Sequence, residues 1–143
     1  MYAFGKRSKE KLVTADTKLQ KAAERALSLG VMDFSIIEAH RSVKRQKELY
    51  DQGKSMIDGE TKKGKHNYEP SLAIDIIPYP AVINDVNVWS DKQRFCVLAG
   101  IMFAAASLEN IKLRWGGDWD GDGNNADSSF HDLPHFEVLE EDV

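Results

Sequence analysis

The sequence predicts an α+β fold in which helices pack against a small, mostly antiparallel sheet. Segments with helical periodicity and short β-branched segments follow one another along the chain in an order that favours this class. The 143 residues suit one domain with one sizeable core. A content of 42% hydrophobic and 29% charged residues is typical of globular proteins. We therefore expect residues 1–143 to form a single domain with no appended binding module.

The first half of the chain contains two predicted helices and one strand. Residues 14–29 read as a helix ended by a left-handed Gly30, because apolar residues recur on one face: Leu19, Ala22, Ala23, Ala26 and Leu27. Residues 34–39 are rich in isoleucine and read as a strand. Ser42 is a candidate N-cap for a helix that runs to about residue 52. The polar segment 53–65 reads as a loop.

The middle of the chain supplies a strand and the most apolar helix. Residues 72–77 read as a strand ended by Pro78. Ser90 and Gln93 have the spacing of a capping box, so we expect the next helix to begin at Ser90 and to end near residue 108. This helix is apolar on most sides and is predicted to be central to the core. The single cysteine, Cys96, excludes an internal disulfide and is expected to be a small buried side chain.

The last third of the chain reads as two strands around a long loop. Residues 111–115 and 135–139 are the strands, and residues 116–133 form a loop rich in Gly, Asp and Asn. Loops of this length in a compact domain tend to carry function.

Charge and hydropathy exclude several classes of protein. A net charge of -4 gives no basic face for nucleic acid and no polybasic contact with an anionic membrane. The longest apolar stretch, residues 95–106, is too short to span a bilayer. Residues 1–11 carry charge with no apolar run behind them, so we expect no signal peptide. A monomer is the simplest expectation for the oligomeric state.

Two histidines and an aspartate form the most informative set of residues. His66, Asp75 and His135 are a three-ligand set for zinc that leaves a fourth position open for water, as in catalytic sites. A carboxylate inside the apolar run 72–77 is costly unless it is paired or bound to a metal. On a strand, Asp75 shares a face with Ala73 and Ile77, and on the last strand His135 shares a face with Glu137. If these strands are neighbours, Asp75 and His135 can meet at one ion, with His66 folding over it.

Other interpretations of the same residues stay open at this level. Either histidine could be an ordinary loop or sheet residue, and Asp75 could pair with Arg41 or Arg114. Asp132 stands three residues before His135, close enough to hold a water and take its proton. Glu137 is a second candidate acid, although we favour a role in orienting a ligand.

Three motifs together resemble a known family. They are Gly64-Lys65-His66 with Ala73-Ile74-Asp75, then Asp132-Leu133-Pro134-His135, and finally His40-Arg41-Ser42 with the downstream Gln46. In these motifs and along nearly its whole length, the chain is similar to the LAS zinc peptidases, which share a fold with D-alanyl-D-alanine carboxypeptidases and the hedgehog N-terminal domain. Within that group it most resembles the bacteriophage endolysins that cleave L-alanyl-D-glutamate bonds. Gly64 replaces the usual serine, and the spacing from His66 to Asp75 is longer than the commonest form.

The resemblance implies a zinc-dependent peptidoglycan hydrolase. His66, Asp75 and His135 would hold Zn²⁺, Asp132 would act as general base and acid, and Arg41 would bind a substrate carboxylate or the oxyanion. Gln46 would lie at the substrate. The enzyme would act on the peptidoglycan stem peptide to lyse the host, without a separate cell-wall-binding domain. It would stay in the host bacterial cytoplasm until another protein permeabilises the membrane. The rivals are a D-alanyl-D-alanine carboxypeptidase or dipeptidase on the same fold and a non-catalytic binding module.

The acidic loop suggests a second ion. Asp118, Asp120 and Asp122 stand at the first, third and fifth positions of an EF-hand-like loop with Gly123 at the sixth. The twelfth position is Ser129, where a bidentate glutamate belongs, so a Ca²⁺ site competes with a simple polar loop. Trp119 in the same loop is the tryptophan expected to face substrate, whereas Trp115 is expected in the core. His131 is a weaker rival to His135 as a metal ligand.

Overall fold

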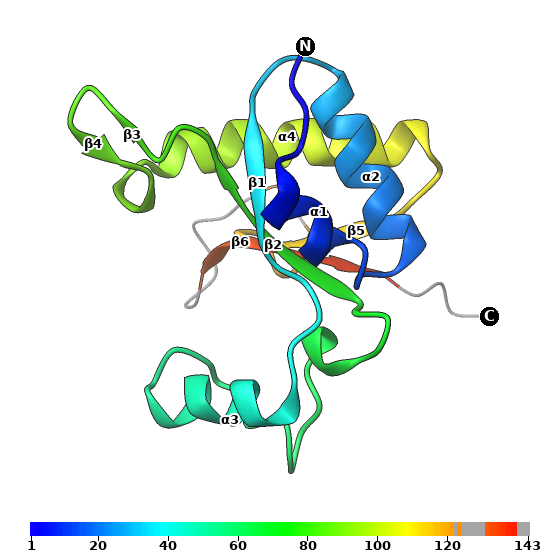
Figure 1. The fold of residues 1–143 in the computed structure, drawn as a ribbon, viewed down its shortest axis with the longest axis vertical. Coiled ribbons are helices and arrows are strands. Elements are labelled where there is room, and N and C mark those ends of the chain that lie inside the picture. Colours follow the sequence, from blue (N-terminus) through cyan, green and yellow to red (C-terminus); the bar gives the residue numbers. More distant parts are fainter. Residues whose placement is uncertain (122, 124–130, 140–143) are drawn as a thin grey trace.

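A four-stranded antiparallel sheet with the strand order β1-β2-β6-β5 forms the centre of the structure (Figure 1). Its strands are β1 (Phe34–Glu38), β2 (Ala73–Pro78), β5 (Leu113–Gly116) and β6 (Asp132–Val138). The last strand therefore lies between two strands that precede it in sequence. The α+β class and the mostly antiparallel sheet are confirmed.

The structure is a computed structural model and describes residues 1–121, 123 and 131–139. Three helices pack against the sheet or against one another: α1 (Lys6–Leu12), α2 (Thr17–Ser28) and α4 (Lys92–Leu108). Helix α2 packs on α4, and α1 packs on β1. None of the helices in these described ranges is long and apolar enough to cross a bilayer.

The alternation of side chains along β2 and β6 separates the core from the opposite face of the sheet. Ile74 and Ile76 of β2, with Phe136 and Val138 of β6, belong to the hydrophobic core beneath the helices. Because side chains alternate along a strand, Asp75 and His135 point to the other face. They are also direct partners in the β2–β6 register. Such partners have Cβ atoms about 5 Å apart on one face, close enough to share a ligand.

A second group of elements extends away from the helical layer. It contains α3 (Val43–Asp51), the 3-10 helix η1 (Lys65–Asn67) and the loop between them, and Figure 1 shows it below the sheet. On the opposite side, a hairpin of β3 (Val82–Ile83) and β4 (Val86–Asn87) leads through η2 (Val88–Ser90) into α4. The polar α3 segment contributes no residue to the main core. It lies instead along the face of the sheet that the helices do not cover, and we call it the α3 wall.

Two of the predicted helix ends are confirmed. The Ser42 side chain accepts a hydrogen bond from the Arg45 amide at 3.1 Å and caps α3. Gly30, with φ of +70°, follows the end of α2 in the left-handed conformation.

Other local predictions were wrong. Helix α4 begins at Lys92, and its cap is Asp91, whose side chain accepts a hydrogen bond from the Arg94 amide. Ser90 instead ends the 3-10 helix η2. This short helix was not predicted, because nothing in the apolar pair Val88 and Trp89 indicates it. Cys96 is exposed, because α4 buries only the side that faces α2 and the sheet. Helix α1 and the β3–β4 hairpin were not predicted, since both are short and carry weak periodicity.

Candidate active site

His66, Asp75 and His135 converge on one point of the exposed sheet face. Asp75 comes from β2, His135 from the neighbouring β6, and His66 from η1. The Oδ1 atom of Asp75 lies 3.2 Å from His66 Nε2 and 3.4 Å from His135 Nδ1. One ligand atom from each of the three residues lies within 4.8 Å of the others. Their side chains are 6%, 13% and 9% exposed, so the cluster is shielded from bulk water.

The hydrogen bonds of the two histidine rings leave the cluster suited to bind a cation. His66 Nδ1 donates to the Ala39 carbonyl oxygen at 2.7 Å, and His135 Nε2 donates to Glu137 Oε1 at 2.9 Å. In a neutral imidazole the other nitrogen is then an acceptor, and both of these nitrogens face a carboxylate oxygen. Three acceptors at one point require a proton or a cation between them. A ring held by a carbonyl or carboxylate on its far nitrogen is also typical of metal-bound histidine.

The protonation of the cluster shows how strongly its charges interact. Burial would lower the pKa of His135, but its hydrogen bonds to Asp75 and Glu137 outweigh burial and raise that pKa to about 9. Burial would raise the pKa of Asp75, yet hydrogen bonds from His135 and His66 hold it well below its usual range. Glu137 follows the same pattern, with its pKa lowered to about 2 by His135 and Arg114.

Asp132 lies beside the cluster at the first residue of β6. Its Oδ2 is 3.9 Å from His135 Nδ1, and its side chain is 38% exposed, so it faces both the cluster and solvent. Burial and the nearby Asp75 carboxylate raise the pKa of Asp132, as suits a group that exchanges protons. Gly116 is paired with Asp132 in the sheet, and a Cβ at Gly116 would collide with the Asp132 carbonyl oxygen. Glycine at this position therefore lets Asp132 approach the cluster.

Arg41 lies partly buried between the cluster and β1, with its side chain 10% exposed. Its Nε and Nη2 donate to the two carboxylate oxygens of Glu38 at 2.9 and 2.7 Å. Nη2 also lies 3.4 Å from Asp75 Oδ2, and Nη1 donates to Gln46 Oε1 at 2.9 Å. Burial opposes the charge of Arg41, but Glu38, Asp75 and Asp132 outweigh it and raise the Arg41 pKa. Arg41 therefore positions Asp75 and keeps one Nη1 hydrogen free among the described contacts.

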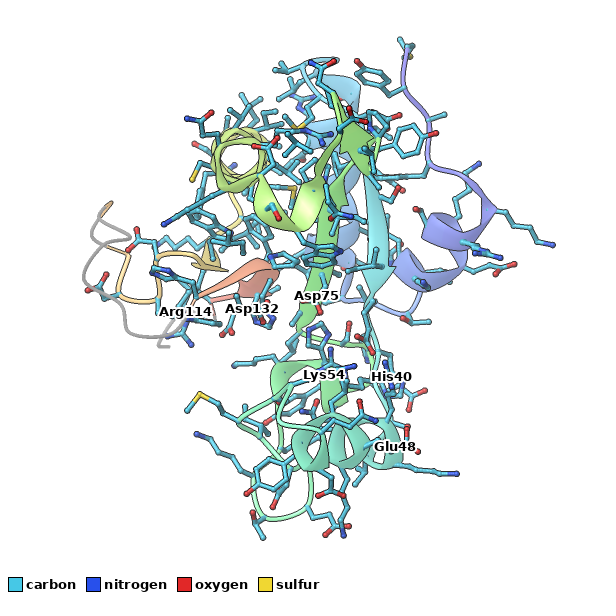
Figure 2. The ribbon with its side chains drawn as sticks, turned by 90° about the vertical axis from the view of Figure 1, so that its left-hand side faces the viewer. His40, Glu48, Lys54, Asp75, Arg114 and Asp132 are labelled. Carbon is cyan, nitrogen blue, oxygen red and sulfur yellow. The ribbon has the colours of Figure 1, made fainter. Side chains whose placement is uncertain are left out.

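The cluster opens into a groove of about 610 Å³ between the sheet and the α3 wall. Trp119 forms part of the groove, with its ring 5.4 Å from the His135 ring, and Arg114 lies next to it. Figure 2 shows Arg114 and Asp132 on the sheet side of the structure and Lys54 on the α3 side, below Asp75. This volume lies within the range of about 300–1,000 Å³ that is usual for ligand-binding sites.

Comparison with known proteins decides the family. A sequence model of the phage L-alanyl-D-glutamate peptidases matches residues 1–139. The chain belongs to this family. It is 35% identical over 131 residues to the L-alanyl-D-glutamate peptidase of Escherichia phage T5, across 92% of this chain and 88% of that protein. It also superimposes on the crystal structure of the L-Ala D-Glu endopeptidase ChiX of Serratia marcescens with a TM-score of 0.73. That match has 26% identity and covers 96% of this chain and 90% of ChiX. The family predicted from the motifs is confirmed.

Gln46, which was predicted to lie at the substrate, hydrogen-bonds to neighbouring residues of this peptidase. It lies in the groove wall but is 2% exposed. Its Nε2 donates to Ser55 Oγ at 2.8 Å and to the Ile57 carbonyl at 2.7 Å, while its oxygen accepts from Arg41. With its amide engaged on both sides, Gln46 ties the loop after α3 to Arg41, and its contact with substrate stays a prediction.

Two carboxylates complete the site of the peptidase. Glu38, which holds Arg41, was not predicted, although it stands three residues before Arg41 at the end of a strand. Glu137 accepts from His135 and pairs with Arg114 at 2.9 Å, which places it where a residue that orients a ligand should be. The shared strand face of His135 and Glu137 was the signal for this contact.

The acidic loop is only partly within the described residues. Asp118 Oδ2 accepts from the Gly123 amide at 2.8 Å, and Asp118 Oδ1 is buried without a hydrogen-bond partner among the described residues. Asp122 and Ser129 lie outside the described residues, so the calcium site stays a prediction. His131 does not belong to the metal-ligand group found in the described part of the chain.

Proposed function

We infer that this peptidase uses a zinc ion held by His66, Asp75 and His135 to cleave the L-alanyl-D-glutamate bond of peptidoglycan stem peptides. The observation that carries this proposal is the buried three-acceptor cluster with Asp132 at its open side. The family and the activities named for the phage T5 and Serratia relatives support the choice of bond. Two nitrogen ligands and one carboxylate favour zinc over magnesium or calcium, which take oxygen ligands.

The chemistry divides between the ion and the side chains of this chain. Zinc, when bound, supplies a Lewis acid that polarises the scissile carbonyl and makes water acidic near neutral pH. Asp132 takes the proton of the attacking water and delivers it to the leaving amine of D-glutamate. The raised pKa of Asp132 suits both steps, because the carboxylate must accept a proton and then release it.

Arg41 and Glu137 keep the reacting groups in place. Arg41 holds the second oxygen of Asp75 and lines the groove, where its guanidinium can donate to a substrate oxygen. Glu137 fixes the ring orientation and tautomer of His135 through the 2.9 Å hydrogen bond. Trp119 packs against the same ring, with the two ring centroids 5.4 Å apart.

A metal analysis combined with a peptide assay tests the proposal. The purified protein should contain one zinc per chain, and mass spectrometry should show cleavage of a synthetic stem peptide between L-alanine and D-glutamate. Asp132→Asn should keep its zinc and lose activity by about 10²- to 10⁴-fold, the usual range for a lost general base. His135→Ala should lose zinc. Asp85→Asn in the exposed β3–β4 turn is the matched control and should change neither property.

The same assay separates the rivals. A D-alanyl-D-alanine carboxypeptidase or dipeptidase would release terminal D-alanine and leave the L-alanyl-D-glutamate bond intact. A non-catalytic binding module would bind peptidoglycan and cut neither bond. Full activity of zinc-loaded Asp132→Asn would contradict the role of Asp132 in proton transfer.

We also propose that one chain is sufficient for activity. The metal ligands, Asp132, Arg41 and both walls of the groove come from a single copy of the chain. Activity should therefore coincide with a monomer in size-exclusion chromatography.

A further inference from the structure

One wall of the groove is lined by lysines. Lys54, Lys62, Lys63 and Lys65 all line it from the α3–η1 segment, opposite the acidic residues of the sheet. Figure 2 shows Lys54 where the α3 side meets the sheet, below Asp75. Lys65 directly precedes His66 in η1, so this wall begins at the metal cluster and runs outward along the loop.

These lysines lack the carboxylates that usually balance such a group. Among the described residues, Lys54, Lys62 and Lys65 have no carboxylate within 4.0 Å, and the amine of Lys63 lies 4.2 Å from the ring centroid of Tyr68. The two acids of the same loop are engaged elsewhere. Asp58 accepts hydrogen bonds from three loop amides and the Thr61 hydroxyl, and Glu60 pairs with Lys47 at 3.4 Å.

The opposite wall of the groove does not supply the missing negative charge. Its four carboxylates belong to Glu38, Asp75, Asp132 and Glu137. Glu38 pairs with Arg41, Glu137 pairs with Arg114 and His135, and Asp132 lies 3.9 Å from His135 Nδ1. A bound divalent cation would compensate Asp75. The chain as a whole carries a net charge of -4, so an uncompensated cationic strip inside its groove points to an anionic ligand.

The proposed substrate contains such a group next to the scissile bond. D-glutamate has two carboxyl groups besides the amine acylated by L-alanine. The peptide continues through only one of them, so the other remains as a free carboxylate on the leaving side. Lysine amines in a partly enclosed groove are suited to recognise it, because charge-assisted hydrogen bonds are stronger away from bulk water.

We propose that the lysine strip of Lys54, Lys62 and Lys65 binds the free carboxylate of the D-glutamate residue and so selects stem peptides in which this carboxylate is not amidated. The inference rests on the proposed function and adds the direction in which substrate lies. The D-glutamate side extends along the α3 wall, and the L-alanine side extends toward Trp119. Leu49 and Ile57 add apolar surface beside the lysines for the aliphatic parts of the peptide.

Two synthetic peptides test the strip directly. They are L-Ala-γ-D-Glu-L-Lys and the same peptide with the free carboxylate of D-glutamate converted to an amide. The zinc-loaded wild type should cleave the acid with about tenfold higher kcat/KM than the amide, as expected for a few partly shielded ion pairs. This preference should shrink as salt is raised from about 0.05 M to about 0.5 M, because added ions screen the contact.

Charge-removing and charge-keeping variants identify the residues. The triple variant Lys54→Gln, Lys62→Gln, Lys65→Gln should raise KM for the acid about tenfold and leave the amide within about twofold. The triple variant with arginine at the same positions should keep the preference. The matched control is Lys9→Gln, Lys18→Gln, Lys21→Gln, which removes the same charge from exposed positions of α1 and α2 outside the groove.

Each alternative result has a distinct meaning. Equal kcat/KM for both peptides in the wild type overturns the carboxylate inference and leaves the proposed function intact. An equal loss on both peptides in the glutamine triple variant overturns it as well, because the lysines would then act through structure. The same loss in the control variant would show a general effect of charge and also overturn it. Failure of the wild type to cleave either peptide overturns the proposed function, and this inference with it.

Discussion

Replacement of Glu137 by glutamine should weaken zinc binding while leaving every direct ligand in place. The Glu137 side chain is 6% exposed, and its two oxygens accept from His135 at 2.9 Å and from Arg114 at 2.9 Å. Glutamine has nearly the same shape but only one acceptor oxygen. Its amide group must then face either the His135 ring N–H or the Arg114 guanidinium, donor to donor.

The magnitude follows from the interactions of His135. Its pKa rises from 6.5 to about 9 despite burial, which corresponds to about 3 kcal/mol of net interaction with its acidic neighbours. Asp75 supplies the larger part and Glu137 the smaller, so the loss of the Glu137 charge should cost about 1–2 kcal/mol. This equals an about 5- to 30-fold weaker zinc affinity and overlaps the range of about 10- to 100-fold observed when residues that orient metal ligands are removed.

Competition with a chromophoric zinc chelator measures the dissociation constant. Glu109→Gln is the matched control, because it removes a carboxylate from a surface pair with Arg25 at 3.9 Å, far from the cluster. It should change zinc affinity by less than about twofold, as expected for a surface ion pair. If Glu137→Gln binds zinc as tightly as the control does, the reasoning that Glu137 orients His135 is refuted.

Further predictions concern the approach of the strands, pH and the second ion. Gly116→Ala should displace Asp132, reduce activity and cost about 1–3 kcal/mol in thermal unfolding, whereas Gly100→Ala, with open space around it, should not destabilise the protein. In the presence of a chelator, melting curves should show stability lost as pH falls from 4.5 toward 2, because the pKa of Glu137 is lowered to about 2. They should also show stability lost as pH rises from 6.5 through 9, because the pKa of His135 is raised to about 9. Calorimetry of the zinc-loaded protein should detect calcium binding at millimolar concentrations if the acidic loop holds this ion, and the absence of heat would end that prediction.

Local sequence patterns predicted those elements whose stability comes from their own periodicity. The apolar face of α2 and the Ser42 cap of α3 are properties of contiguous residues, so they could be read without knowledge of the fold. The start of α4 was misplaced because Ser90 was taken as its cap, whereas Ser90 ends the 3-10 helix and the next residue, Asp91, caps α4. The exposure of Cys96 could not be read, because it depends on which side of α4 faces α2.

In the site, too, contacts that follow from local periodicity could be predicted, whereas contacts that depend on the folding of loops could not. The face shared by His135 and Glu137 follows from strand periodicity, and the structure bears out their contact. The engagement of Gln46 with Arg41, Ser55 and Ile57 could not be predicted, because it depends on how the loop after α3 folds back. The pairing of Glu38 with Arg41 escaped for a related reason, since a turn between β1 and α3 brings the two side chains together.

The sequence by itself determined the chemical types available for the site: two imidazoles, a carboxylate inside an apolar strand, and an acid three residues before the second histidine. It also determined the family, because the three motifs keep their order along the chain. Only the tertiary structure decided that Asp75 and His135 are direct partners, that Arg41 is already held by Glu38, and that lysines face the groove. The physical reason is that strand pairing and loop closure join residues tens of positions apart, and no local propensity specifies such contacts.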